Sequence, residues 1–107
     1  MARKSKGGRS SRHTDIDAAD YIRRRRVNDG LSRASLANLI QQHGIAAGYP
    51  PARVKVSDDL LRLIEVTGHE PGPRAKFAIA LYFGKRPGQI WARDALEVVE
   101  TRVEVVA

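Results

Sequence analysis

GLSRASLA (residues 30–37) and VSDDLLRLIE (residues 56–65) are the two stretches of sequence that decide the fold. In each, a serine precedes apolar residues at helical spacing, and a serine hydroxyl readily accepts a hydrogen bond from a free amide at a helix start. Gly44 and Gly68 follow these stretches, and glycine commonly ends a helix. The sequence therefore predicts one helix from after Ser32 to Gly44 and another from after Ser57 to Gly68.

Three further helices are predicted around these two. The first begins at Asp15 or Asp17, either of which suits the positive end of a helix, and it ends near Asn28. Proline is favoured at the first helical position, so Pro73 opens the fourth helix and Pro87 the fifth. We expect the fourth helix to bury Phe77, Ala78, Leu81 and Tyr82, and the fifth to place Ile90 and Trp91 in the core.

Residues 45–55 separate the two deciding stretches. Pro50 and Pro51 stand in a row there, and consecutive prolines exclude a helix interior. We expect an exposed loop, with or without a short extended piece at residues 53–56. The fold class is then all-α, a five-helix bundle at residues 15–93 between a disordered basic arm (1–14) and a tail (94–107).

The charge of the chain indicates which classes of partner it can bind. A net charge of +7 favours polyanions, and the longest apolar run, residues 77–83, is too short to cross a bilayer. Residues 1–26 carry nine Lys and Arg against three Asp, whereas residues 94–107 carry one Arg against four acids. The chain has no cysteine, which excludes disulfides and thiolate metal sites and fits a reducing cytosol.

The two deciding stretches resemble the lambda-repressor/Cro-like helix-turn-helix family. The motifs follow one another in the family's order. GLS and LA lie in residues 30–37, and VS and IE lie in residues 56–65, with Gly68 soon after. Then come PGP (71–73), a helix ending in FG (83–84), and PGQIW (87–91). The resemblance covers roughly residues 17–92, and the style is similar to small regulators of phages and mobile elements. One departure is the long connection at residues 41–55, which is either a wing or a sign that the helices pair differently.

The resemblance implies that the helix after Ser57 enters the DNA major groove. It puts Ser57, Asp58, Asp59 and Arg62 at groove-facing positions, although the two acids also suit the positive end of that helix. It puts Arg33 at a position that contacts the DNA backbone, and a wing would add Arg53 and Lys55. Leu36, Leu60 and Ile64 match the positions that pack the two helices together. The apolar spacing of the helix after Ser57 itself predicts a buried stripe of Leu60, Leu61 and Ile64, with or without Leu63.

Four consecutive arginines, residues 23–26, cover every side of the first helix, so at least one lies near the core. The resemblance puts Arg25 on that side, where its aliphatic stem covers the core and its guanidinium reaches water. We expect Arg23, Arg24 and Arg26 to contact phosphates. The alternative is a solvated face paired with Asp20 and Asp29.

The sequence also predicts a role for each end of the chain. In the arm, Arg3 and Lys4 are expected to contact DNA phosphates together with the neighbouring cations, and the alternative is a solubilising tail. In the tail, valines recur both at helical and at strand spacing, so helix and strand stay open. Its valine-rich, acidic composition makes residues 94–107 the candidate for dimerisation, and packing on its own domain is the alternative.

The sequence thus predicts a sequence-specific double-stranded DNA-binding transcriptional regulator, a phage or mobile-element repressor or Cro-like homodimer of the bacterial cytoplasm or nucleoid. A nonspecific nucleic-acid-binding protein and an antitoxin-type interaction module are the alternatives. The three histidines have no metal-ligand spacing, and no residue set supplies a catalytic mechanism. We expect no enzymatic activity, cofactor, metal, membrane or small-molecule substrate.

Overall fold

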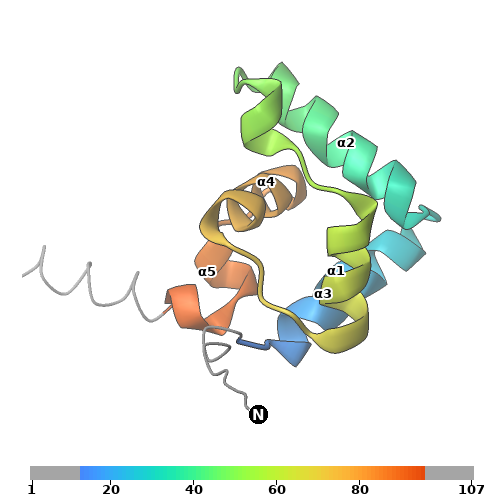
Figure 1. Ribbon diagram of the computed structural model, residues 1–107, viewed down its shortest axis with the longest axis vertical. Helices are drawn as coiled ribbons and strands as arrows, with labels where there is room; N and C mark the ends of the chain where they lie inside the picture. Colours follow the sequence, from blue (N-terminus) through green and yellow to red (C-terminus); the bar gives the residue numbers. More distant parts are fainter. Residues whose placement is uncertain (1–12, 96–107) are drawn as a thin grey trace, which may run out of the picture.

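The computed structural model describes residues 13–95 of the chain. Within them it has helices and no strand (Figure 1), which confirms the all-α prediction. Five helices are those that the sequence predicts, and η2, a short 3-10 helix, is an addition. In chain order they are α1 (Ile16–Asn28), α2 (Arg33–Ala46), η2 (Pro51–Val54), α3 (Asp58–Thr67), α4 (Pro73–Phe83) and α5 (Pro87–Ile90). The predictions for residues 1–12 and 96–107 lie outside the described residues.

The predicted helix starts are confirmed by their hydrogen bonds. The Asp15 carboxylate accepts a hydrogen bond from the backbone N–H of Ala18 at the start of α1. Ser32 in the same way accepts from Ser35 in α2, and Ser57 accepts from Leu60 in α3, each at 3.0 Å. Gly68 closes α3 in the left-handed conformation, with φ of 78°. A β-branched or bulky residue is strained at such a φ, which explains the glycine at this position.

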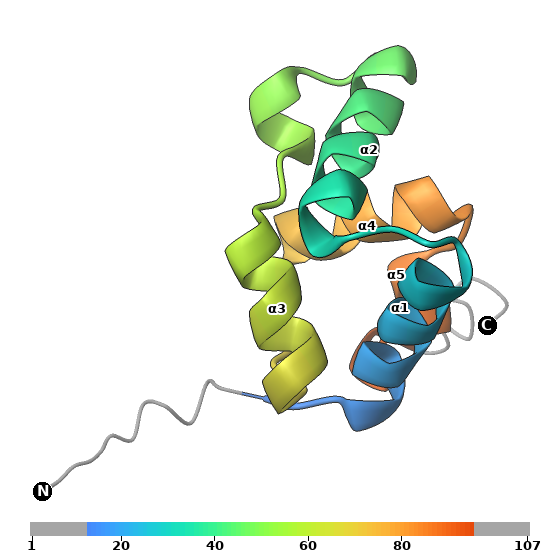
Figure 2. The same cartoon turned by 90° about the vertical axis from the view of Figure 1, so that its right-hand side faces the viewer.

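α4 lies between the other helices. It packs against α2 and η2 on one side and against α5 on the other, while α3 packs against both α1 and α2. Figure 2 shows α3 along one edge of the molecule and α2 with η2 side by side at one end. The direct contact between α2 and α3 means that the long connection does not separate the two helices whose sequences decide the fold.

The prediction that Gly44 ends the second helix is wrong. α2 continues to Ala46, and Gly44 is a buried residue inside it. A Cβ at Gly44 would lie 2.5 Å from the Cβ of Val54, so glycine is needed there because η2 packs directly on α2. The expectation of an exposed loop is wrong in part for the same reason, since Val54 is fully buried.

The buried side of α4 also differs from the prediction. Ala78 is buried and Phe77 and Tyr82 pack at the edge of the core, but Leu81 is only half-buried. A second buried stripe has the helical spacing i, i+3, i+4, i+7 and consists of Lys76, Ile79, Ala80 and Phe83. The stripe begins with a lysine, which is normally exposed, and for this reason the sequence did not indicate it. Trp91 is fully buried, as expected.

Candidate nucleic-acid interface

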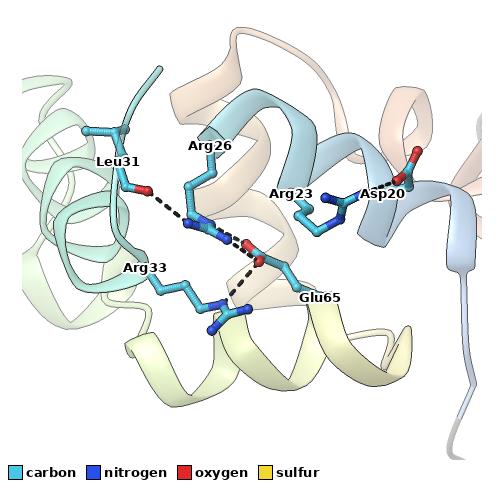
Figure 3. A network of polar contacts seen from close by, with 6 residues as sticks. All are labelled: Asp20, Arg23, Arg26, Leu31, Arg33 and Glu65. Carbon is cyan, nitrogen blue, oxygen red and sulfur yellow. Dashed lines mark hydrogen bonds and ion pairs between the residues drawn. The ribbon is translucent and has the colours of Figure 1, made fainter. Parts of the chain in front are cut away.

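The carboxylate of Glu65 on α3 joins three helices. It accepts two hydrogen bonds from Arg26 on α1, both of 2.8 Å, and one of 3.1 Å from Arg33 at the start of α2. Arg26 also donates to the backbone carbonyl of Leu31, at 2.8 Å, in the turn between α1 and α2 (Figure 3). This cluster of Arg26, Arg33 and Glu65 fixes α3 relative to the start of α2.

Two members of the cluster, Glu65 and Arg26, are shielded from water, whereas Arg33 is partly exposed. The Glu65 side chain has no exposed surface, and that of Arg26 is 14% exposed. The hydrogen bonds that Arg26 donates to Glu65, together with the negative charge of Glu65, raise the pKa of Arg26 above its usual value, against the opposing effect of burial. A bidentate pair of this kind has little freedom to reorient, so the position of α3 is well defined.

The outward face of α3 consists of Asp59, Arg62, Leu63 and Val66. It lies opposite the buried residues Leu61 and Ile64, and all four of its side chains are exposed. Arg62 forms no ion pair with any residue in the range 13–95. The face therefore offers one free guanidinium, one carboxylate and two apolar side chains to a partner.

A hollow of about 580 Å³ borders α3 on the side of Leu60. Lys55 in front of α3 and Arg74 in the first turn of α4 both line it, and both residues are exposed. Arg74 donates a hydrogen bond of 3.3 Å to the carbonyl of Ala52, which links α4 to η2. With Arg33 in the Glu65 cluster on one side and Lys55 and Arg74 beside the hollow on the other, α3 has cations along both of its sides.

The other residues predicted for this region, Arg53, Ser57, Asp58 and Asp59, are all exposed. Ser57 caps α3, so its hydroxyl is already engaged. Asp58 and Asp59 are exposed in the first turn of α3, where their charge suits the helix dipole. Arg53 is exposed on η2, and its neighbour Ala52 lines the hollow.

The arginine run of α1 is divided between core and surface. Arg23 and Arg24 form ion pairs with Asp20, at 2.9 and 2.8 Å, as in the alternative of a solvated face. Arg25 lies over the Phe83 ring, 4.9 Å from its centre, and donates to the Tyr21 hydroxyl. Arg25 is thus packed on the core as expected, whereas Arg26 is taken up by Glu65. Arg3 and Lys4 lie outside the described residues.

Three residues of this region received no role from the sequence: Glu65, Val66 and Arg74. Leu63 was left open as a further member of the buried stripe of this helix, and the structure exposes it. Glu65 carried a usable signal, because an acid between buried residues of an amphipathic helix requires a cationic partner. No local feature of the sequence indicated Arg74, because Arg74 and Lys55 line the same hollow only as a result of how η2 packs.

No group of three or more possible metal ligands lies together within residues 13–95. In the same part of the chain, no helix has the length and apolar character needed to cross a membrane. Comparison with protein-family models, with curated proteins and with solved structures finds no match to the chain. What the chain binds must therefore be judged from its own residues.

Proposed function

We propose that the chain is a sequence-specific double-stranded DNA-binding transcriptional regulator, with α2 and α3 as a helix-turn-helix of the lambda-repressor/Cro-like kind. The observation that carries the proposal is the outward face of α3, which is held in place by Glu65 and has cations on both sides. A DNA major groove is about 12 Å wide and admits one α-helix, with a phosphate chain along each wall.

The charges divide into the two kinds of contact that such a protein needs. Arg62, on the outward face, can bind O6 and N7 of a guanine with two hydrogen bonds. Arg33 on one side and Lys55 with Arg74 on the other are positioned for the two phosphate chains, which fix the register of a protein on DNA. The connection 47–57 adds Arg53 on η2 to these cations, since its side chain is exposed.

Two features reduce the number of cations that can bind DNA. One is the pair of acids at the start of α3, and the other is the ion pairing within the arginine run of α1. Asp58 and Asp59 neutralise the helix end, so affinity comes from the flanking cations and not from the α3 terminus. Arg26 is committed to Glu65, and we leave it out of the contact surface. We further propose a homodimer on a two-fold site, since paired half-sites are usual for such proteins.

Selection of bound sequences from a random duplex pool tests the proposal. We expect one enriched site, in two inverted halves. Arg62→Ala should then weaken binding to this site by about 1–3 kcal/mol and weaken binding to random DNA less. Arg86→Ala removes the same charge at the start of α5, away from α3, and serves as the matched control.

The outcomes separate the classes of function. A pool without enrichment, bound tightly at low salt, would indicate a nonspecific nucleic-acid-binding protein and overturn the proposal. Equal losses on selected and random DNA would reduce Arg62 to a phosphate contact. No DNA binding at all would favour an interaction module of the antitoxin type.

A further inference from the structure

Two large apolar side chains on α3 are neighbours and are both exposed to solvent. Leu63 is 43% exposed and Val66 is 65% exposed, and their spacing of three residues puts them on one side of the helix. Single exposed apolar residues need no explanation, but two neighbours at the centre of the candidate interface do. Neither packs on the domain core as Leu61 and Ile64 do.

The surroundings of Leu63 and Val66 indicate the partner that covers them. Arg62 shares their face, Arg33 lies beyond it on one side, and Lys55 and Arg74 lie beyond Leu60 on the other. A protein partner would have to bring matching acids along both sides. Duplex DNA has this arrangement already, with two phosphate chains and the base edges between them.

The major groove has one apolar group, the C5 methyl of thymine, and alkyl side chains recognise it by contact. We infer that Leu63 and Val66 read thymine methyl groups, so that α3 specifies thymine by apolar contact and guanine through Arg62. This inference rests on the proposed function, because it requires α3 to lie in the groove. It adds the chemical group that the helix recognises.

Deoxyuridine substitution tests the inference on the selected site. Uracil pairs as thymine does and lacks only the methyl group, so each thymine of the site is replaced in turn. Where Leu63 or Val66 covers the methyl, we expect affinity to fall about three- to fivefold. Leu63→Ala and Val66→Ala should weaken binding to the thymine site and abolish the difference between thymine and uracil at one position each.

Ile45→Ala is the matched control, because Ile45 is an exposed apolar residue at the far end of α2. It should leave the full deoxyuridine effect in place. Replacing a cytosine by 5-methylcytosine at a position that prefers thymine should restore part of the affinity.

Each result decides for or against the inference. An enriched site that depends on Arg62 but tolerates uracil everywhere would overturn methyl recognition and leave the proposed function standing. Absence of any enriched site would overturn both. A uracil effect that survives in both alanine variants would assign the methyl contacts to other residues. If the alanine variants bind DNA normally but lose self-association, the apolar pair is a protein interface instead.

Discussion

At the scale of single residues, Glu65 has the largest structural role in the candidate interface. Its carboxylate is fully buried and is shared by Arg26 and Arg33. A buried charge is tolerated only when it is paired, and loss of one partner leaves the other unpaired. The position of α3, and with it the orientation of Arg62, therefore depends on this one side chain.

We predict that Glu65→Gln lowers the free energy of unfolding by about 3 kcal/mol, because Arg26 loses its partner in a shielded site. Urea denaturation at neutral pH measures the change. Asp20→Asn is the control, since Asp20 pairs with Arg23 and Arg24 at the surface. Exposed pairs contribute about 0–1 kcal/mol, so this variant should stay near the wild type. Similar losses in both variants would mean that the Glu65 cluster is a surface pair in solution.

At the scale of elements, the length of α2 and the position of η2 depend on each other. α2 continues two residues beyond Gly44, and η2 turns back to place Val54 against that glycine. Val54 also lies in the core next to residues of α4, so this contact ties the long connection to the domain. The connection is therefore a packed part of the fold that carries Arg53 and Lys55.

Gly44→Ala tests this packing. Replacing a glycine by alanine inside a helix normally stabilises by about 0.5–1 kcal/mol. Here we predict a loss of about 1–3 kcal/mol, because the new methyl overlaps the side chain of Val54. Thermal unfolding measures the change.

The double variant Gly44→Ala with Val54→Ala should recover part of this loss, since the second substitution removes the overlapping methyl groups. The two changes are then non-additive, as expected for residues in direct contact. A stabilised Gly44→Ala variant would show that η2 does not pack on α2.

At the scale of the whole molecule, Lys76 on α4 links two segments that are distant from each other in the sequence. Its ammonium group contacts Glu70 from the α3–α4 connection and Asp94 after α5, the latter at 2.9 Å. The same group lies 5.6 Å from the centre of the Trp91 ring. Burial by itself lowers the pKa of Lys76, but hydrogen bonds and charges of the two carboxylates raise it above its ordinary value of 10.5.

The sign of this shift predicts an alkaline loss of stability. A lysine whose pKa is raised by folding stabilises the domain fully below pH 10.5, and the stabilisation disappears as the pH rises through the folded value. Unfolding curves at a series of pH values should show this fall in the wild type. In Lys76→Met we expect about 3–5 kcal/mol less stability at neutral pH, where Glu70 loses this partner, and a smaller alkaline fall.

Lys55→Met is the control for the alkaline fall, because Lys55 is exposed beside the hollow. This variant should keep both the neutral stability and the pH dependence of the wild type. If Lys76→Met and Lys55→Met have the same pH profile, the contacts of Lys76 contribute nothing specific to folding.

Much of the fold was predictable because helix starts and ends depend on residues a few positions apart. Ser32 and Ser57 were identified as caps and Asp15 as one of two candidates with Asp17, and each of the three accepts a hydrogen bond from the backbone N–H three residues further on. Gly68 and Gly84 end their helices in the left-handed conformation for an equally local reason. Gly44 was misread by the same rule, since nothing local distinguishes a glycine that ends a helix from one that makes room for Val54.

The sequence by itself determined the five α-helices, most of their limits and the excess of positive charge, since these follow from local hydrogen bonding and composition. Only the tertiary structure decided which arginine of the run pairs with Glu65, 39 residues away, and which cations lie beside α3. It also decided that Lys76 is buried and that Leu63 and Val66 are exposed. The physical reason is that burial and ion pairing depend on which distant segments pack against each other, and a local pattern of residues does not determine that packing.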